Sequence, residues 1–266
     1  QASRFIESLL LGLPVPGIFL SKDDDSNKML VIDGQQRLET LRRFYDSRFS
    51  NDEEFALHNV QPEYEGKTYA DLDEEDRRKL DDSIIHATIV RQDSPADDKS
   101  SIYHVFERLN TGGTPLTAQQ IRAALFHGKP LTELLADLNR LKPWREMMGP
   151  VDPKGKDTEL ILRFLALYED AGSYEQPMKD FLNNFMSRRA KAPKAAADKY
   201  RKVFSDTASV VRSCLGERAF RPERTFNAAV YDAVMVGLAR RLESKSKKPK
   251  CDDLQKAYEG LLKNKE

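Results

Sequence analysis

Five consecutive residues combine an acid, a glycine, two amides and an arginine: Asp33-Gly34-Gln35-Gln36-Arg37. The apolar run 29–32 before them has the composition of a β-strand. The residues after them place apolar side chains at the spacing of one helix face, at Leu38, Leu41 and Phe44. The sequence therefore predicts a strand that passes through a tight glycine turn into a helix.

Two interpretations of this turn follow from its residue types. In the first, Gly34 supplies a positive φ angle and Asp33 caps the helix, while the amides are solvated and Arg37 begins a basic face. In the second, the turn is an anion site, because backbone N–H groups at a helix N-terminus favour negative charge by ~0.3–1 kcal/mol. Gln35 and Gln36 then add neutral donors, and Arg37 offers a planar fork that matches phosphate oxygens. The local sequence leaves both open.

A second polar glycine turn follows the predicted helix 98–109, at Asn110-Thr111-Gly112-Gly113. It is either a simple loop between helices or a second ligand contact, in which Asn110 orients the ligand and the glycine N–H groups approach phosphate. Thr117 and Gln120 predict a capping box at the start of the next helix. Arg122, one turn further on, either adds charge to such a site or lies on the surface.

The composition excludes several function classes. Acidic and basic residues number 43 each, so no strong global field favours nucleic acid or a membrane surface. No apolar run has membrane-spanning length. The two cysteines, Cys214 and Cys251, lack metal-ligand spacing, and we expect them to be reduced in a cytoplasmic protein. The four histidines also show no metal-binding spacing.

Hydrophobic periodicity predicts an α+β protein. Strand-like runs occur at 17–21, 28–32 and 84–90, with helices at 2–11 and 73–82 around a polar, acidic stretch. After residue 91 the pattern is helical, at 98–109, 117–127, 130–140, 157–170, 176–189, 195–215, 226–243 and 252–263. We expect a small mixed sheet with helices in a domain of residues 1–128, and a helical domain of residues 129–266.

Two stretches carry a family resemblance: "FIESLLLGLPVPGIFL…LVIDGQQRLETL" and "VFERLNTGGTPLTAQQIRAALFHG". They closely resemble the N-terminal domain of GmrSD-type restriction enzymes, over about residues 3–128. The stretch "RTFNAAVYDAVMVGLA" (224–239) resembles the helical end of that family more weakly. The order of helix, strand, strand and Gly…Arg turn is also similar to ParB and sulfiredoxin. The resemblance implies that Gly34, Gln35, Gln36 and Arg37 cradle a nucleotide.

Three departures from the family pattern bear on activity. The upstream Gln-Arg…Tyr…Trp stretch is not in this sequence. Where the family commonly has Gln-Glu-Ile-Arg, this chain has Gln119-Gln120-Ile121-Arg122, which puts hydrolysis in doubt more than binding. The His-Asn-His nuclease half of two-part members is not visible. We therefore do not expect this chain alone to cut DNA.

The first hypothesis is a nucleotide-binding sensor or switch module, with or without NTP hydrolysis, in a restriction or anti-phage system acting on foreign or modified DNA. In this hypothesis the residues of the polar turn are the catalytic ones. Arg37 neutralises phosphate charge, and Gln35 or Gln36 orients water. Asp33 holds Mg²⁺ unless it is a helix cap. The nucleoside triphosphate, of unspecified base, would contact Gly34, Gln35, Gln36, Arg37, Asn110, Thr111, Gly112, Gly113 and Arg122.

The alternative is a DNA- or partner-binding protein that grips backbone phosphate with the same turn and hydrolyses nothing. A ParB-like nuclease is a third reading, for which the sequence shows no carboxylate cluster. In the first reading DNA is contacted directly or through a partner nuclease, no membrane is involved, and the oligomeric state is open.

Overall fold

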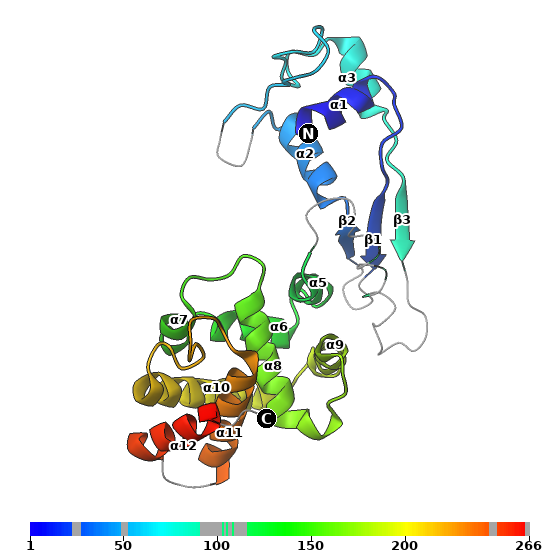
Figure 1. Ribbon diagram of the computed structural model, residues 1–266. Coiled ribbons are helices and arrows are strands. Elements are labelled where there is room, and N and C mark those ends of the chain that lie inside the picture. The colour runs from blue at the N-terminus through cyan, green and yellow to red at the C-terminus, as the bar shows by residue number, and fades with distance from the viewer. Residues whose placement is uncertain are drawn as a thin grey trace. The chain divides into compact units, whose positions relative to one another are not determined.

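The computed structural model describes residues 1–22, 28–48, 53–90, 116–244 and 249–263, together with Tyr103, Val105 and Arg108. The chain divides into two compact units. The N-terminal unit holds the described residues up to 90 with Val105 and Arg108, and the C-terminal unit holds those from 116 onward with Tyr103. Each unit has its own secondary structure, coloured by position in the chain in Figure 1.

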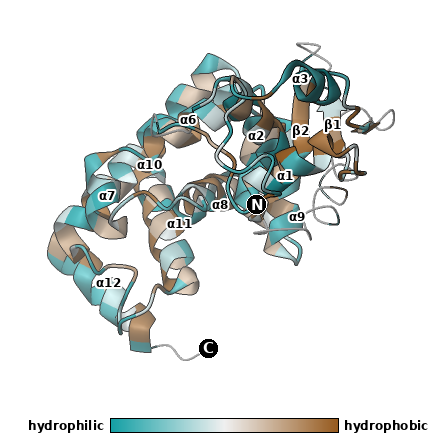
Figure 2. Ribbon diagram, turned by 90° about the horizontal axis from the view of Figure 1, so that it is seen from above, coloured by the Kyte–Doolittle hydropathy of each residue, from teal (hydrophilic) through white to brown (hydrophobic). Residues whose placement is uncertain are grey.

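The N-terminal unit contains a three-stranded mixed sheet in the order β2-β1-β3. Strand β1 (Ile18–Lys22) is central, antiparallel to β2 (Met29–Asp33) and parallel to β3 (Ala87–Val90). Figure 2 shows β1 and β2 largely in the colour of apolar residues. Phe19 is paired with Asp33, so the beginning of β1 lies beside the end of β2.

Among the described residues up to 90, this unit has the helices α1 (Ala2–Leu10), α2 (Gln35–Tyr45) and α3 (Glu74–Asp81). Phe44 of α2 and two apolar residues of the acidic stretch, Phe55 and Leu57, are fully buried. The core also takes Ile6, Leu9, Leu10, Tyr64, Leu72 and Leu80. The acidic stretch thus supplies core residues, which its composition did not indicate.

The described part of the C-terminal unit is helical. It consists of α5 (Ala118–Leu125), α6 (Pro130–Leu138), α7 (Lys142–Met148), α8 (Lys156–Asp170), the 3-10 turn η1 (Ala171–Ser173), α9 (Met178–Arg189), α10 (Lys194–Leu215), α11 (Ala228–Ser244) and α12 (Cys251–Lys263). Trp144 of α7 is fully buried and packs on the rings of Phe204, Phe220 and Tyr231.

These elements confirm the predicted α+β class, with a small mixed sheet followed by a helical region. Helix α7 was missed by the sequence analysis. Helix α5, which the division at residue 128 assigns to the first domain, packs on α8 and α9 in the C-terminal unit. Within the described ranges, no helix combines the length and apolar character needed to cross a membrane.

The expectation of two reduced cysteines is wrong in this structure. Cys214, near the end of α10, and Cys251, the first residue of α12, form a disulfide. Their separation of 37 residues hid the pairing, because helix packing rather than sequence spacing brings them together.

Candidate functional site

Gly34 makes the predicted turn between β2 and α2. It is buried, has a φ angle of +95°, and stands at the N-cap position of α2. A Cβ atom placed on it would lie 2.5 Å from Cγ2 of Ile18, closer than real Cβ contacts come. Both the left-handed backbone and the close approach to β1 therefore require glycine here.

The N-terminus of α2 receives no side-chain cap, and its first turn holds no acidic residue. Asp33 therefore does not act as the helix cap that the simpler interpretation assigned to it. Gln35 and Gln36 are exposed and follow Gly34 directly. Backbone N–H groups at such a terminus lack intrahelical partners and favour an anion.

Two acceptors hold Arg37 in place, one in the last residue of β2 and one in the residue before β1. Its Nη2 atom donates to Oδ2 of Asp33 at 2.5 Å and to the carbonyl oxygen of Gly17 at 3.0 Å. The Arg37 side chain is 23 % exposed and that of Asp33 is 40 % exposed. The Nε atom of Arg37 is buried and has no hydrogen-bond partner among the described residues. The Nη2 atom of the guanidinium is thus fixed by two hydrogen bonds, while the other guanidinium N–H groups can still donate.

The sequence analysis did not identify Gly17, whose carbonyl oxygen accepts from this arginine, or His86, which packs against Gly17. The carbonyl oxygen of His86 accepts from the N–H of Ile18 at 2.8 Å, and it would lie 2.8 Å from a Cβ atom on Gly17. The beginnings of β1 and β3 therefore meet where β2 ends. The glycine before the strand in "PVPGIFL" was the available signal for this close approach.

The other arginines of α2 are neutralised locally. Glu39 accepts hydrogen bonds from both Arg42 and Arg43, and Asp46 accepts from Arg42. The hydrogen bond from Arg42, with Arg43 adding to it, lowers the pKa of Glu39 to about 2. The positive charge that remains near the start of α2 is that of Arg37, itself partly balanced by Asp33.

The predicted second turn, Asn110-Thr111-Gly112-Gly113, lies outside the described residues, so a pocket shared with Gly34 stays a prediction. The capping box that follows it is confirmed. Oγ1 of Thr117 accepts from the backbone of Gln120, whose Oε1 accepts from the backbone of Thr117 at 2.8 Å. Glutamate fills this capping position equally well. Gln120, which stands where the family commonly has glutamate, therefore keeps the capping role of that position.

Arg122 lies in the C-terminal unit and is fully buried, so the surface interpretation of this residue is wrong. Its guanidinium donates to Gln119 Oε1 at 2.9 Å, to Asn183 Oδ1 at 2.8 Å, and to the carboxylate of Glu159. Burial lowers the pKa of Arg122, while Glu159 opposes that shift. These contacts join α5, α8 and α9, and the role of Arg122 in ligand binding stays a prediction.

Asp33 is the one carboxylate in the Asp33–Arg37 turn. Across the ranges that the structure describes, no group of three or more His, Cys, Asp or Glu side chains is arranged to hold a metal ion. A single carboxylate is consistent with Mg²⁺ held chiefly by ligand phosphates and water. The uncapped N–H groups at the start of α2 and the Arg37 guanidinium are both groups of a kind that can bind phosphate oxygens.

Residues 1–127 match the family model for the GmrSD restriction endonuclease, N-terminal domain. The matched range contains the sheet, the Asp33–Arg37 turn and α5. No curated protein sequence and no solved structure matches the chain.

Proposed function

Because residues 1–127 are a GmrSD-type restriction endonuclease N-terminal domain, we propose that their Asp33–Arg37 turn binds the phosphates of a nucleotide. The family name places the domain in restriction, a defence activity directed at DNA. In this proposal nucleotide binding is the sensing or switching step of a system that acts on foreign or modified DNA.

The observation that carries the proposal is the start of α2. Gly34 opens the helix in the left-handed conformation, no side chain caps the free N–H groups, and Arg37 stands one turn in. A helix N-terminus and an arginine fork are both known phosphate ligands, and here they lie within one turn.

In this proposal each residue of the Asp33–Arg37 turn has its own role in binding the phosphates. Arg37 neutralises phosphate charge, and its contacts with Asp33 and Gly17 keep the guanidinium oriented. Gln35 and Gln36 are exposed and can donate to phosphate oxygens or orient a water molecule. Asp33 has a free oxygen for a Mg²⁺ hydration shell, since Oδ2 makes the bond to Arg37. When bound, Mg²⁺ supplies charge neutralisation between phosphates.

Binding without hydrolysis is the second candidate. It is favoured by the engagement of Asp33 with Arg37, which leaves the turn without an unpaired carboxylate to activate water. In that case the turn grips a nucleotide, or the backbone phosphate of DNA, as a fixed contact. A partner nuclease would then cleave the DNA. The oligomeric state of such an assembly is open.

Calorimetric titration of the full chain with ATP, GTP, CTP and UTP, each with Mg²⁺, tests the proposal. We expect saturable binding of at least one nucleotide and its loss in Arg37→Ala. Arg42→Ala is the matched control, because Arg42 lies on the same helix but pairs with Glu39 and Asp46. Phosphate release by the same samples separates hydrolysis from binding. Absence of binding to all four, or equal losses in both variants, would overturn the proposal.

A further inference from the structure

Arg37 by itself leaves most of the negative charge of a polyphosphate unbalanced. It is a single cation, and Asp33 already pairs with it at 2.5 Å. The other two arginines of α2 both pair with Glu39. Sites that bind polyphosphates usually combine several donors around the phosphates. A nucleotide held at the Asp33–Arg37 turn therefore calls for a further donor from a neighbouring element.

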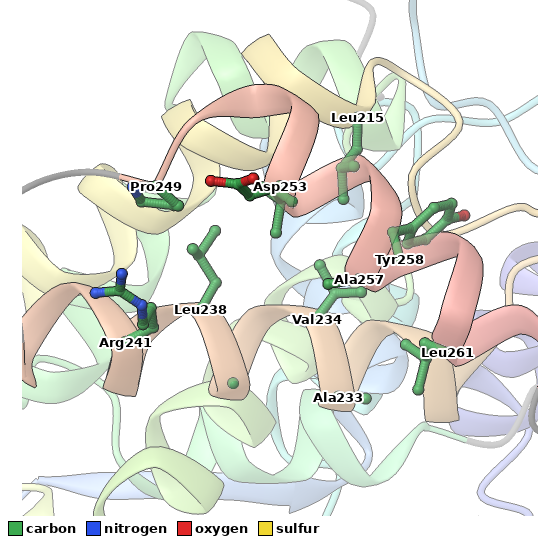
Figure 3. Close-up of a pocket in the computed structure, with 12 residues that line it drawn as sticks. Leu215, Ala233, Val234, Leu238, Arg241, Pro249, Asp253, Ala257, Tyr258 and Leu261 are labelled. Carbon is green, nitrogen blue, oxygen red and sulfur yellow. The ribbon is translucent and has the colours of Figure 1, made fainter.

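The groove between α11 and α12 in the C-terminal unit is not a second phosphate site. It encloses about 390 Å³, and apart from Arg241, Asp253 and Tyr258 its lining residues are apolar or glycine (Figure 3). Arg241 and Asp253 are opposite in charge, so the groove offers a polyanion no excess of positive charge. Among the described residues, the surroundings of Arg37 suit phosphate better than this groove.

The end of the sheet beside Arg37 brings three strands together. Phe19 of β1 is paired with Asp33 of β2 on one side and with Thr88 of β3 on the other. Paired residues point to the same face of a sheet, as do residues two apart along one strand. His86, two residues before Thr88, therefore lies on the face that Asp33 occupies, across β1 from it.

Gly17 lies between Arg37 and His86 and has no side chain to separate them. Its carbonyl oxygen accepts from Nη2 of Arg37 at 3.0 Å, and a Cβ atom built on it would lie 3.6 Å from Cβ of His86. Strands β2 and β3 are two strand spacings apart, ~10 Å. A diphosphate or triphosphate, with its hydrogen bonds, can span that distance.

The imidazole of His86 is available for such a contact. His86 is exposed, and its side chain has no hydrogen-bond partner within the part of the chain that the structure describes. Its backbone carbonyl, by contrast, accepts from the N–H of Ile18 at 2.8 Å and fixes its place beside β1. An imidazole carries an N–H donor in either tautomer and a positive charge when protonated, so it suits phosphate oxygens.

We propose that His86 is a further phosphate ligand of the nucleotide site. The inference rests on the proposed function, since it extends the same site from α2 across Gly17 to β3. The start of α2 and Arg37 hold one phosphate, and His86 donates to a phosphate further along the chain. A monophosphate held at Arg37 does not reach His86. His86 therefore makes the site select diphosphates and triphosphates over monophosphates.

Calorimetric titration of the full chain with ATP, GTP, CTP and UTP, and with the four corresponding monophosphates, tests this inference. His86→Ala should weaken triphosphate binding ~10-fold and leave monophosphate binding unchanged, because only the triphosphate loses a hydrogen bond to a charged group. His86→Gln keeps a neutral N–H donor and should lose less. Arg37→Ala should weaken both kinds of ligand.

His58→Ala is the matched control, because His58 is an exposed histidine of the same unit that contacts Glu65 instead. It should leave both affinities unchanged, and a thermal melt of each variant confirms that it is folded. Triphosphate affinity that His86→Ala does not reduce overturns the inference and leaves the phosphate turn in place. An equal loss for triphosphate and monophosphate also overturns it, since the ring would then contact the sugar or base. Absence of binding by the unaltered chain overturns the proposed function as well.

Discussion

Asp33 and Arg37 form an ion pair across the first turn of α2, with 2.5 Å between Oδ2 and Nη2. The pair spans the i,i+4 spacing and is partly exposed, so its contribution to stability is only ~0.3–0.5 kcal/mol. Its geometric effect is larger, because it holds the guanidinium beside the uncapped helix start. The ion pair therefore contributes more to the orientation of Arg37 than to the stability of the core.

Arg37→Ala should weaken nucleotide binding by ~1.5–3 kcal/mol, because a charge-assisted hydrogen bond to phosphate is removed. The midpoint of thermal unfolding should stay close to that of the unaltered chain. Titration calorimetry and a thermal melt of the same preparation check both. Unchanged affinity, with binding present in the unaltered chain, would place the phosphates elsewhere.

Asp33→Asn separates the two roles of this carboxylate. If Asp33 only orients Arg37, removing its charge should strengthen Mg²⁺-free nucleotide binding about 2- to 5-fold, since repulsion of phosphate falls. The increase in affinity that Mg²⁺ produces should then be the same in both proteins. We expect instead that the Mg²⁺ effect shrinks in Asp33→Asn, because the proposal assigns the free carboxylate oxygen to the Mg²⁺ hydration shell. An equal Mg²⁺ effect in the two proteins would leave Asp33 with the orienting role alone.

Gly34→Ala should destabilise the N-terminal unit more than the same change at Gly66. Both glycines have positive φ angles, +95° and +79°, which cost an alanine ~1–2 kcal/mol. Only at Gly34 does the new Cβ atom meet another side chain, Ile18, which adds ~1–3 kcal/mol of overpacking. Denaturant unfolding of the two variants measures the difference. Equal losses of unfolding free energy in the two variants would show that Ile18 of β1 shifts at little cost to make room for the new Cβ atom.

The turn at Gly34 could be predicted because its information is local. A β-branched run, a glycine and a helical spacing lie within one short stretch, and the capping box of Thr117 and Gln120 is equally local. The predicted strands and helices confirmed by the structure share this property. Their bounds shift by a few residues, since helix ends depend on tertiary contacts.

What the sequence concealed depends on contacts between distant segments. Arg122 donates a hydrogen bond to Asn183, 61 residues away, so its burial between helices could not be predicted from the local sequence. The disulfide of Cys214 and Cys251 is hidden in the same way. Phe55 and Leu57 were missed because the acidic residues around them dominate the composition.

Arg122→Ala should lower the free energy of unfolding of the C-terminal unit by ~3–5 kcal/mol, because it leaves buried polar partners unpaired. Gln119 and Asn183 are both buried and lose their donor. Arg188→Ala is the control, since Arg188 is 51 % exposed in its pair with Asp170 and should cost under ~1 kcal/mol. A loss for Arg122→Ala as small as that of the control would show that its buried hydrogen bonds contribute little to stability.

Reduction of the disulfide should release α12 from the C-terminal unit while its core stays folded. Helix α12 contributes no fully buried residue, and besides the disulfide its side chains reach the carbonyl oxygens of Cys214 and Ala219 through Gln255 and Tyr258. Reduction breaks the covalent bond that ties α12 to the end of α10 across a sequence separation of 37 residues. The buried Trp144, the single tryptophan of the chain, does not depend on that link.

Hydrogen exchange of residues 251–263, measured with and without a dithiol reductant, checks this expectation. We expect exchange in α12 to rise at least ~10-fold on reduction, because local opening follows local stability. The fluorescence of Trp144 should not change. Cys251→Ser should exchange rapidly in both conditions, which controls for other effects of the reductant. Slow exchange of α12 in Cys251→Ser would mean that helix packing, not the disulfide, holds α12 against α10 and α11.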